Sequence, residues 1–457
     1  MATDAQDHGA HGSGPPLASE REPPKHAFDG VGHPAHTVLA HEDELERELH
    51  HAVAAEAPAI EDLLRTLIEQ PTTLGNEEAG QAVMRDALRD LGLEPVNVPM
   101  DAEGLRAHPA AAPFDWDVGG KANVVATWGR DEGGRSLILN GHIDVVPPDP
   151  IPEWSHPPFS ATRDGDWIHG RGAADMKCGL AAIVGAVRAI RRLGLEPTAR
   201  VHIESVVEEE CTGNGTLATV MSGYTADAAV IAEPFGAAIT TSQVGVLWFH
   251  VRVLGTAGHA ADGARGGNAI ERSFDVMRGL RGLEAELNTA PPSPYDALTH
   301  PINLNVGAIR GGEWTSTVPF SCETSYRIAL YPGTSVDDFR ERIEAVVRHS
   351  ADGSAPAPEV RYAGLASEGY ELDEDHPLVT TLAAAFARGI GKPPELVATT
   401  GTTDAIVLGA AGHTPAVCFG PYAEGAHGVD ERVWFPSVVQ TAQVMASFVR
   451  DWCGLSG

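Results

Sequence analysis

Short runs of apolar and β-branched residues alternate with helical segments along this chain, and that alternation limits the fold more than any other feature. Such runs occur at residues 123–127, 136–140, 201–207 and 228–232, and a long helix is expected at about 178–193. Strands that are continuous apolar runs and alternate with helices are typical of parallel sheets covered on both faces. The sequence therefore predicts an α/β fold with a mixed, largely parallel sheet flanked by helices.

The pattern changes near residue 243 and later returns to the first style. Runs at 246–254, 303–309 and 322–330 alternate apolar and polar residues, helical stretches lie among them, and a last strand is expected near Val360. This order is typical of a ferredoxin-like α+β sheet with helices on one face. We predict a mobile tail at 1–40, an α/β domain built from residues 41–242 and 359–457, and an inserted α+β domain at 243–358.

The first forty residues are rich in Gly, Pro, His and Ala and show no apolar period, which is typical of a mobile segment. Eight of the 20 histidines precede residue 52, but their irregular spacing defines no single metal site. A solvated tail and loose metal binding are both consistent with this composition. From Glu42 to about Glu69, apolar residues recur every three or four positions, which predicts one amphipathic helix ended by Pro71.

An excess of acidic residues narrows the classes of partner. The chain carries 32 Lys and Arg against 63 Asp and Glu, a formal charge of −31, so neither nucleic acid nor a membrane surface is expected to bind. No stretch approaches the roughly 20 apolar residues that span a bilayer, and the N-terminus lacks the pattern of a secretion signal. The five cysteines form no CxxC pair. We expect a cytoplasmic protein.

Candidate functional residues follow the second apolar run. His142 and Asp144 come directly after residues 136–140, and in open α/β sheets functional groups collect at the carboxyl ends of strands. Asp144 is placed to accept a hydrogen bond from the second nitrogen of the His142 imidazole, which would orient a metal-binding ring. Asp175 precedes the helix at 178–193, where either a metal ligand or a helix N-cap is expected.

Three adjacent glutamates, residues 208–210, follow the run at 201–207. Three neighbouring carboxylates repel one another unless water solvates them or a cation neutralises them. Glu233 stands at the end of the next run, and His427 follows a further strand that is predicted at 415–419. Imidazole and carboxylate ligands together suit zinc or a similar divalent ion, and this set suffices for two ions that share one bridging carboxylate.

These motifs make the chain similar to a known family. It resembles the co-catalytic di-zinc metallopeptidases and deacylases, which include acetylornithine deacetylase, succinyl-diaminopimelate desuccinylase, aminoacylase and glutamate carboxypeptidase. The resemblance extends from about Glu42 to the end of the chain. It implies a zinc-exopeptidase-like catalytic domain, in which the inserted domain at 243–358 is a lid and dimerisation domain. The matching motifs are GHIDVVP (141–147), GRGAADMK (170–177), EEE (208–210), AEP (232–234) and AHGVDE (426–431).

The resemblance assigns a role to each candidate ligand. His142 and Glu233 would hold one metal ion, Glu210 and His427 would hold the other, and Asp175 would bridge them. The implied cofactor is a pair of divalent ions, with zinc as the first expectation and cobalt or manganese as alternatives.

The resemblance also implies catalytic roles. Glu209 would take a proton from the attacking water and pass it to the leaving amine. Asp144 would orient His142, and the peptide bond after Asp175 would be cis. His259, in the segment GTAGHA, would come from the lid of a partner subunit and stabilise the tetrahedral oxyanion, so a homodimer through the lid is implied.

Substrate contacts carry over less directly. Ser316 lies where many relatives have Asn, and Arg327 lies further from the following Pro-Gly than the substrate-binding Arg of relatives does. Gly401 and Thr402 match the glycine-rich loop on the substrate side of the family's site. These four are the expected substrate-binding residues.

The predicted activity is the metal-dependent removal of an acyl group from a small N-acylated amino acid or related amide, as in acetylornithine deacetylase. Formylaminopyrimidine deformylase, succinyl-diaminopimelate desuccinylase and dipeptidase or carboxypeptidase activities are alternatives within the class. From another class, an inactive metal-binding scaffold would keep the ligands but would have no use for a base at Glu209. Cys178 and Cys211 are interpreted as small buried fillers, with metal capture or oxidation as the alternative.

Overall fold

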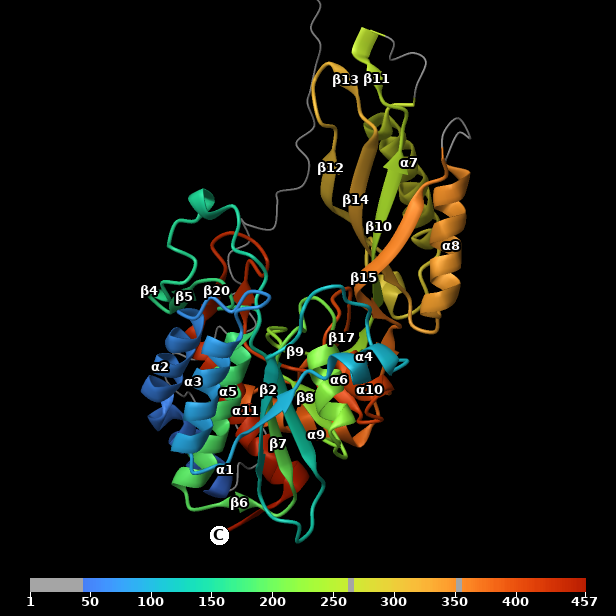
Figure 1. Ribbon diagram of the computed structural model, residues 1–457. Coiled ribbons are helices and arrows are strands. Elements are labelled where there is room, and N and C mark those ends of the chain that lie inside the picture. Colours follow the sequence, from blue (N-terminus) through green and yellow to red (C-terminus); the bar gives the residue numbers. More distant parts are fainter. Residues whose placement is uncertain (1–43, 262–266, 351–355) are drawn as a thin grey trace, which may run out of the picture. The chain divides into compact units, whose positions relative to one another are not determined.

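Over residues 44–261, 267–350 and 356–457, which the computed structural model describes, the larger sheet has nine strands (Figure 1). In spatial order they are β1 (Val96–Pro99), β2 (Ala122–Trp128), β7 (Val201–Val206), β3 (Leu137–His142), β8 (Ala229–Ile231), β18 (Ala416–Cys418), β9 (Ala238–Gln243) and β16 (Tyr370–Glu371), with β17 (Glu395–Thr399) also paired to β9. The middle strands β7, β3, β8 and β18 are parallel, which confirms the predicted fold class. The predicted tail at 1–40 lies outside the described residues.

The parallel strands are buried because helices cover both faces of the sheet. Every residue of β3, β7, β8 and β18 is buried, as expected for continuous apolar runs in such a sheet. One face carries α1 (Glu44–Ala55), α2 (Ala57–Ile68), α3 (Glu78–Asp90), α5 (Lys177–Arg192), α9 (Pro377–Ile390) and α11 (Phe435–Cys453), and the other carries α4 (Ala102–Ala107), α6 (Asn214–Met221) and α10 (Ala405–Ala410) (Figure 1).

The first helical stretch consists of two helices, so the prediction of one helix from Glu42 to Glu69 is wrong. α1 ends at Ala55, and α2 begins at Ala57 with Pro58 in its first turn. Proline has no amide hydrogen to donate to the carbonyl four residues earlier, so it interrupts a helix interior but fits a first turn. Both helices bury their apolar faces, and the apolar period therefore continues across the break.

A second, four-stranded sheet forms the inserted lid. Its elements are β10 (Gly245–Leu254), α7 (Ala269–Leu287), β12 (Leu304–Gly311), β14 (Ser321–Leu330), α8 (Val336–His349) and β15 (Glu359–Ser367). The strand order is β12-β14-β10-β15, all neighbours are antiparallel, and α7 and α8 pack together beside the sheet. The predicted ferredoxin-like α+β unit is confirmed.

The lid continues past residue 358, where the domain boundary was predicted. β15 pairs with β10 from Glu359, opposite Arg252, to Ser367, opposite Val246. The strand expected near Val360 thus belongs to the lid sheet, as its place in the predicted strand order indicates, and only the boundary at 358 was set too early. The segment DGSAPAP at 352–358 has the composition of a hinge, and the structure describes it only from residue 356 onward.

Small sheets join segments that are far apart in the sequence. β5 (Trp167–His169) pairs with β4 (Thr162–Asp164) and with β20 (Arg432–Trp434), which also pairs with β19 (Ala423–Glu424). The residues after His169 therefore lie beside those before Arg432. In the lid, β11 (Gly258–His259) pairs with β13 (Thr317–Val318). Outside the lid, β6 (Glu196–Pro197) pairs with β21 (Leu455–Ser456) near the C-terminus. No described helix is long and apolar enough to cross a membrane.

A buried carboxyl group lies within the parallel sheet. Glu204 of β7 is fully buried, and its Oε2 accepts hydrogen bonds from Asn140 Nδ2 at 3.1 Å and Thr219 Oγ1 at 3.3 Å. Its Oε1 has no partner among the described residues. Burial raises the pKa of Glu204 to about 8, so the group holds its proton at neutral pH.

Replacing Glu204 by Gln should therefore change how stability depends on pH. Between pH 4.5 and about 8 the Glu204 carboxyl group keeps its proton in the native state and loses it in the unfolded chain. The wild-type free energy of unfolding therefore falls with rising pH, and this group contributes up to ~1.4 kcal/mol per pH unit to the fall. Relative to wild type, Glu204→Gln should gain stability from pH 5 to pH 8 in urea titrations. Exposed Glu94→Gln is the control, and parallel curves for Glu204→Gln and wild type would contradict the prediction.

Candidate metal centre

The candidate ligands come from one edge of the larger sheet. His142 is the last residue of β3, Glu210 follows β7, and Glu233 follows β8. Because β7, β3 and β8 are neighbouring parallel strands, their carboxyl ends meet at the same edge. Asp175 lies in the turn before α5, and His427 lies in the loop between β19 and β20. The structure brings all five predicted ligands together.

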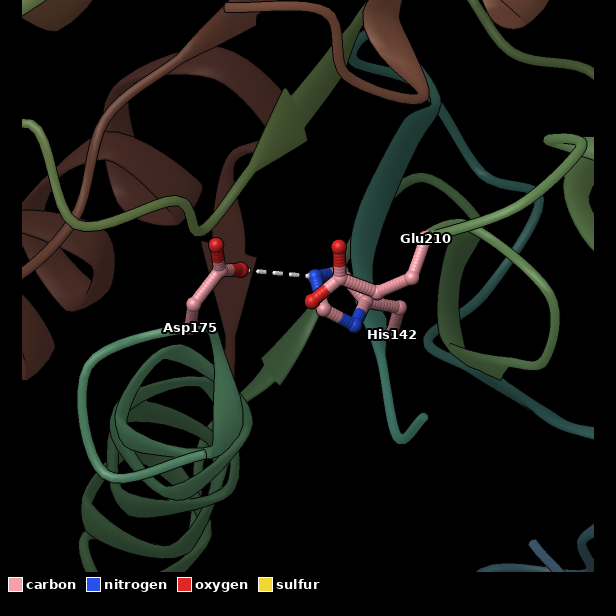
Figure 2. Close-up of side chains that lie close together, drawn as sticks. All are labelled: His142, Asp175 and Glu210. Atoms are coloured by element: carbon pink, nitrogen blue, oxygen red, sulfur yellow. Dashed lines mark hydrogen bonds and ion pairs between the residues drawn. The ribbon is translucent and has the colours of Figure 1, made fainter. Parts of the chain in front are cut away.

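Asp175 lies at the centre of this cluster. Its Oδ1 is 2.9 Å from His142 Nε2, and its Oδ2 is 3.2 Å from His427 Nε2, so each carboxylate oxygen faces one imidazole. His142 Nε2 is also 3.6 Å from Glu233 Oε1, and His427 Nε2 is 2.9 Å from Glu210 Oε2. In Figure 2, His142, Asp175 and Glu210 point toward one another, and one ligand atom of each lies within 4.8 Å of the others.

Carboxylates surround both imidazoles and hold protons on them. Burial opposes a charge on His142, but the neighbouring carboxylates, Glu209 foremost, outweigh it and keep the pKa of His142 well above its usual value. Hydrogen bonds to Asp175 and Glu210 raise the pKa of His427 to about 11. A divalent cation supplies the same positive charge, and a mixed set of nitrogen and oxygen ligands fits zinc, cobalt or manganese. The donor set therefore fits the implied metal pair.

Glu209 and Glu233 complete the cluster. Glu209 Oε2 lies 3.8 Å from His142 Nε2, and the residue is buried yet lines a cavity. Burial raises the pKa of both carboxyl groups well above the usual range. Repulsion by Glu233 raises the pKa of Glu209 further, and repulsion by Asp175 and Glu210 raises that of Glu233. A divalent cation beside them favours the ionised forms, because opposite charge offsets the cost of burial.

The predicted hydrogen bond from His142 to the Asp144 carboxylate is not formed. His142 Nδ1 donates to the backbone carbonyl of Asp144 at 2.9 Å, whereas the carboxylate Oδ1 is 3.8 Å away. A backbone acceptor fixes the tautomer of the ring equally well. The Asp144 carboxylate instead accepts from the backbone N–H groups of Glu209 at 3.3 Å and Glu210 at 3.1 Å. It therefore holds the turn after β7.

A buried ion pair, which the sequence did not predict, anchors the same turn. Glu208 has a φ of +63°, a conformation that is uncommon outside glycine and that persists only where contacts hold it. Lys121 Nζ lies 2.7 Å from Glu208 Oε1, and Trp116 Nε1 donates to that oxygen at 2.9 Å. With Glu208 held in this way, Glu209 and Glu210 reach the cluster. A single lysine before a strand is too common a feature to reveal this role.

Asp175 is placed by the close approach of α5 to β8. A Cβ atom at Gly179 would lie 2.0 Å from the backbone oxygen of Ala232, so only glycine allows this contact. The N-cap of α5 is Met176, and no side chain caps the helix, so the alternative that Asp175 is an N-cap is wrong. The Asp175–Met176 peptide bond is cis, as the resemblance implies.

A cavity of about 810 Å³ opens onto the cluster between the larger sheet and the lid. Asp175, Glu209, Glu210, Glu233 and His427 line its catalytic side. The lid and the loop after β17 contribute further lining residues, among them Trp248, His250, Asn305, Arg327, Gly401 and Thr402. Three of the four predicted substrate-binding residues therefore line the cavity.

Ser316 and His259 lie away from this cavity, at the β11–β13 ribbon of the lid. His259 is exposed and pairs with Thr317, and the backbone carbonyl of Ser316 accepts from the Ala260 N–H at 3.0 Å. Neither residue lines the cavity. A substrate contact from Ser316 stays a prediction, because within its own subunit the ribbon places this residue away from the cavity.

Comparison with known proteins places the chain in a family. Residues 138–451 match Peptidase family M20/M25/M40, and the chain belongs to this family. An N-formyl-4-amino-5-aminomethyl-2-methylpyrimidine deformylase of Halalkalibacterium halodurans is 31% identical over 369 residues, 74% of this chain and 85% of the relative. An acetylornithine deacetylase of Proteus mirabilis is 30% identical over 346 residues, 73% of this chain and 83% of the relative. The resemblance is confirmed, and this protein is a hydrolase of amide bonds.

Solved structures show the same fold. A dipeptidase from Saccharomyces cerevisiae superposes with a TM-score of 0.73 at 15% identity, over 89% of this chain and 98% of that chain. An M20 family metallo-carboxypeptidase from Sulfolobus solfataricus has a TM-score of 0.67 at 17% identity, over 90% of this chain and 99% of that chain. At these identities the likeness establishes the fold alone.

Removing divalent metal should destabilise the protein, because the clustered carboxylates would lose the charge that offsets their repulsion. A metal present at 100 times its Kd stabilises the native state by about 2.7 kcal/mol, which for a chain of 457 residues corresponds to about 3 °C in Tm. EDTA should therefore lower the Tm by about 3 °C for each ion removed, and added zinc should restore it. Thermal unfolding followed by circular dichroism measures the shift. An Asp175→Ala variant should respond much less, and equal shifts in both proteins would contradict the prediction.

Proposed function

We propose that this protein removes an acyl group from a small N-acylated amino acid or related amide by metal-dependent hydrolysis. The observation that carries the proposal is the place of Glu209, whose carboxyl group lines the cavity 3.8 Å from His142 and beside the ligand cluster. A scaffold that only binds metal has no use for a base at this point. Curated relatives named as deformylase, desuccinylase and deacetylase support an acyl-amide substrate.

The cofactor that we propose is a pair of divalent ions, with zinc as the first expectation. His142 and Glu233 would hold one ion, Glu210 and His427 the other, and Asp175 would bridge them. The distances support this division, since Glu233 is the glutamate nearest to His142 Nε2, Glu210 is the one nearest to His427 Nε2, and each imidazole faces one oxygen of Asp175. Ions in this place supply Lewis acidity, which polarises an amide carbonyl and makes water more acidic.

Glu209 moves the proton in the proposed reaction. Its carboxylate accepts a proton from the attacking water and delivers it to the amide nitrogen as the C–N bond breaks, which releases a free amine. The acid formed from the acyl group gives the second proton of that water to solvent and leaves as a carboxylate. The Asp144 carboxylate accepts from the Glu209 backbone N–H at 3.3 Å and so holds the base in place.

The amine portion of the substrate would face Arg327. This guanidinium lines the cavity, burial lowers its pKa, and its Nη2 donates to the Thr400 carbonyl at 3.3 Å. Among the described residues no carboxylate forms an ion pair with it. A largely buried arginine without a carboxylate partner is suited to a substrate carboxylate. An N-acyl amino acid of the acetylornithine type, flanked by Gly401 and Thr402, is therefore the leading candidate.

Trp248 favours a second candidate. Its indole lines the cavity and packs against Gly364, where a Cβ atom would lie 2.4 Å from the indole ring. The flat ring of a formylated aminopyrimidine can stack on an indole. Two curated relatives, 31% and 30% identical to this chain, are named as deformylases of such a compound.

A substrate panel tests the proposed activity. With zinc or cobalt added, we expect release of free amine from at least one of the N-acetylated, N-formylated and N-succinylated amino acids or an N-formylated aminopyrimidine. Arg327→Ala should lower kcat/KM about tenfold or more for substrates that carry a carboxylate, and change it little for those that do not, because a charged hydrogen bond is lost. Inactivity toward the whole panel with metal bound would favour the scaffold.

Glu209→Gln is the matched control for this panel. It keeps the size of the side chain but cannot accept the proton, so turnover should fall by about 10²–10⁴. Metal content, measured by elemental analysis, should not change. Retained turnover would rule out Glu209 as the base.

We further propose a homodimer that forms through the lid. His259 is exposed and does not line the cavity of its own subunit, so the site lacks this histidine unless a partner supplies it. β12 is an edge strand of the lid sheet, and unpaired edges and exposed apolar side chains are typical of subunit contacts. Large exposed apolar side chains on the lid are Phe274, Ile309, Trp314 and Phe320.

Mixing two inactive variants tests whether subunits share the site. His259→Ala and Glu209→Gln should each be nearly inactive alone. In a mixed dimer one site has an intact Glu209 and receives an intact His259, so random mixing should restore about one quarter of wild-type activity. No recovery after subunit exchange, confirmed by native mass spectrometry, would contradict a shared site.

The cysteines support a cytoplasmic location, which we also propose. All five are buried and unpaired, as is typical of a reducing compartment. Burial raises the pKa of the Cys178 and Cys211 thiols, so both remain protonated and unreactive. This supports their interpretation as buried fillers.

A further inference from the structure

We propose that the buried ion pair of Arg171 and Glu431 is a positioning element that sets the separation of Asp175 and His427, and through it the second metal subsite. The inference rests on the proposed two-metal function. Both residues are almost completely buried, and neither lines the cavity. They act through the ligands beside them.

Glu431 organises the turn that carries Asp175. Its Oε1 accepts from the backbone N–H groups of Gly172 at 2.9 Å, Ala174 at 2.8 Å and Asp175 at 3.1 Å. Its Oε2 pairs with Arg171 Nη1. Three N–H donors on one carboxylate oxygen fix the backbone of the turn, including the peptide unit that carries the bridging ligand.

Arg171 reaches from this turn to the loop that carries His427. Its Nη2 donates to the backbone carbonyls of Gly428 at 3.1 Å and of His427 and Pro147, both at 3.4 Å. The ring centre of Trp154 lies 5.2 Å from the guanidinium carbon. A planar guanidinium can bind a carboxylate and several carbonyls at once, which an ammonium group cannot do with the same geometry.

Strand pairing brings the two loops together, and the ion pair then fixes their ends. β5 pairs with β20, and the Gly170 N–H donates to the Glu431 carbonyl at 2.9 Å. In the loop before Glu431, φ is +64° at His427 and +56° at Asp430. Such conformations persist only where contacts hold them. A buried ion pair adds little stability over apolar packing, so its role here is geometric.

The two metal subsites depend on this pair to different degrees. His142 and Glu233 are placed by the parallel strands β3 and β8. His427 lies in a loop with 53% of its side chain exposed, and its backbone accepts from Arg171. Loosening the ion pair should therefore weaken the subsite of His427 first.

A cobalt(II) titration of the metal-free full-length protein measures both subsites through the visible absorbance of bound cobalt. Wild type is expected to bind two ions. In Glu431→Gln, which keeps the side-chain size but loses the charge, the Kd of the second ion should rise about tenfold or more, while that of the first should change less than about threefold. Turnover lost at limiting cobalt should return at saturating cobalt.

Two further variants separate positioning from general stability. Arg171→Lys keeps the charge without the planar fork, and it should show the same selective loss if Glu431→Gln does not fold. Glu46→Gln is the matched control, since it removes a buried carboxylate that pairs with Arg388 at 2.8 Å, in helices that contribute no ligand. It should lower the Tm without changing either Kd.

The outcomes distinguish the two proposals. Unchanged affinities in Glu431→Gln and Arg171→Lys, or an equal loss at both subsites, would overturn the positioning role while the proposed function stands. A folded wild type that does not bind two cobalt ions would overturn the two-metal function itself. A selective loss of the second ion, absent in Glu46→Gln, supports the proposal.

Discussion

The crowding of carboxylates at one buried edge of the sheet is the constraint on which the rest of this structure depends. Burial and like-charge repulsion both raise the free energy of the ionised groups. The outer acids are compensated within the protein: Glu208 pairs with Lys121, and Glu431 pairs with Arg171 and three backbone N–H groups. Asp175, Glu209, Glu210 and Glu233 lie beside one another and beside the imidazoles of His142 and His427, and a divalent cation stabilises such a group of ligands. The fold thus separates the carboxylates that position the loops of the site from the carboxylates that are the candidate metal ligands.

The cavity has opposite character at its two ends. Acidic side chains line the catalytic side, whereas the lid side offers Arg327, His250 and the indole of Trp248. In the proposed function, the carboxylate of an N-acyl amino acid would be attracted to the arginine while its acyl amide faces the ligand cluster. The lid would then contribute to substrate orientation.

Much of the fold and of the candidate site could be predicted from the sequence. Continuous apolar runs locate the parallel strands, and the residues directly after them are the ones that meet at the sheet edge. The errors have a common origin in contacts with distant segments. The lid extends past the predicted boundary at residue 358 because β15 pairs with β10, and the Asp144 carboxylate binds the turn after β7 rather than His142. None of these partners is visible in a local pattern, whereas Pro58 was a local signal that the apolar period obscured.

The sequence by itself determined how strands and helices alternate along the chain, the family, and the residue types that carry the chemistry. Periodicity and strand-end motifs are local properties of the chain. Only the tertiary structure decided which oxygen of Asp175 faces which imidazole and how the loops behind the ligands are held. Arg171 and Glu431 are 260 residues apart, and their contact exists because β5 and β20 pair. The partners of a buried polar group are set by packing between such distant segments, since each group must find a hydrogen bond wherever the fold places it.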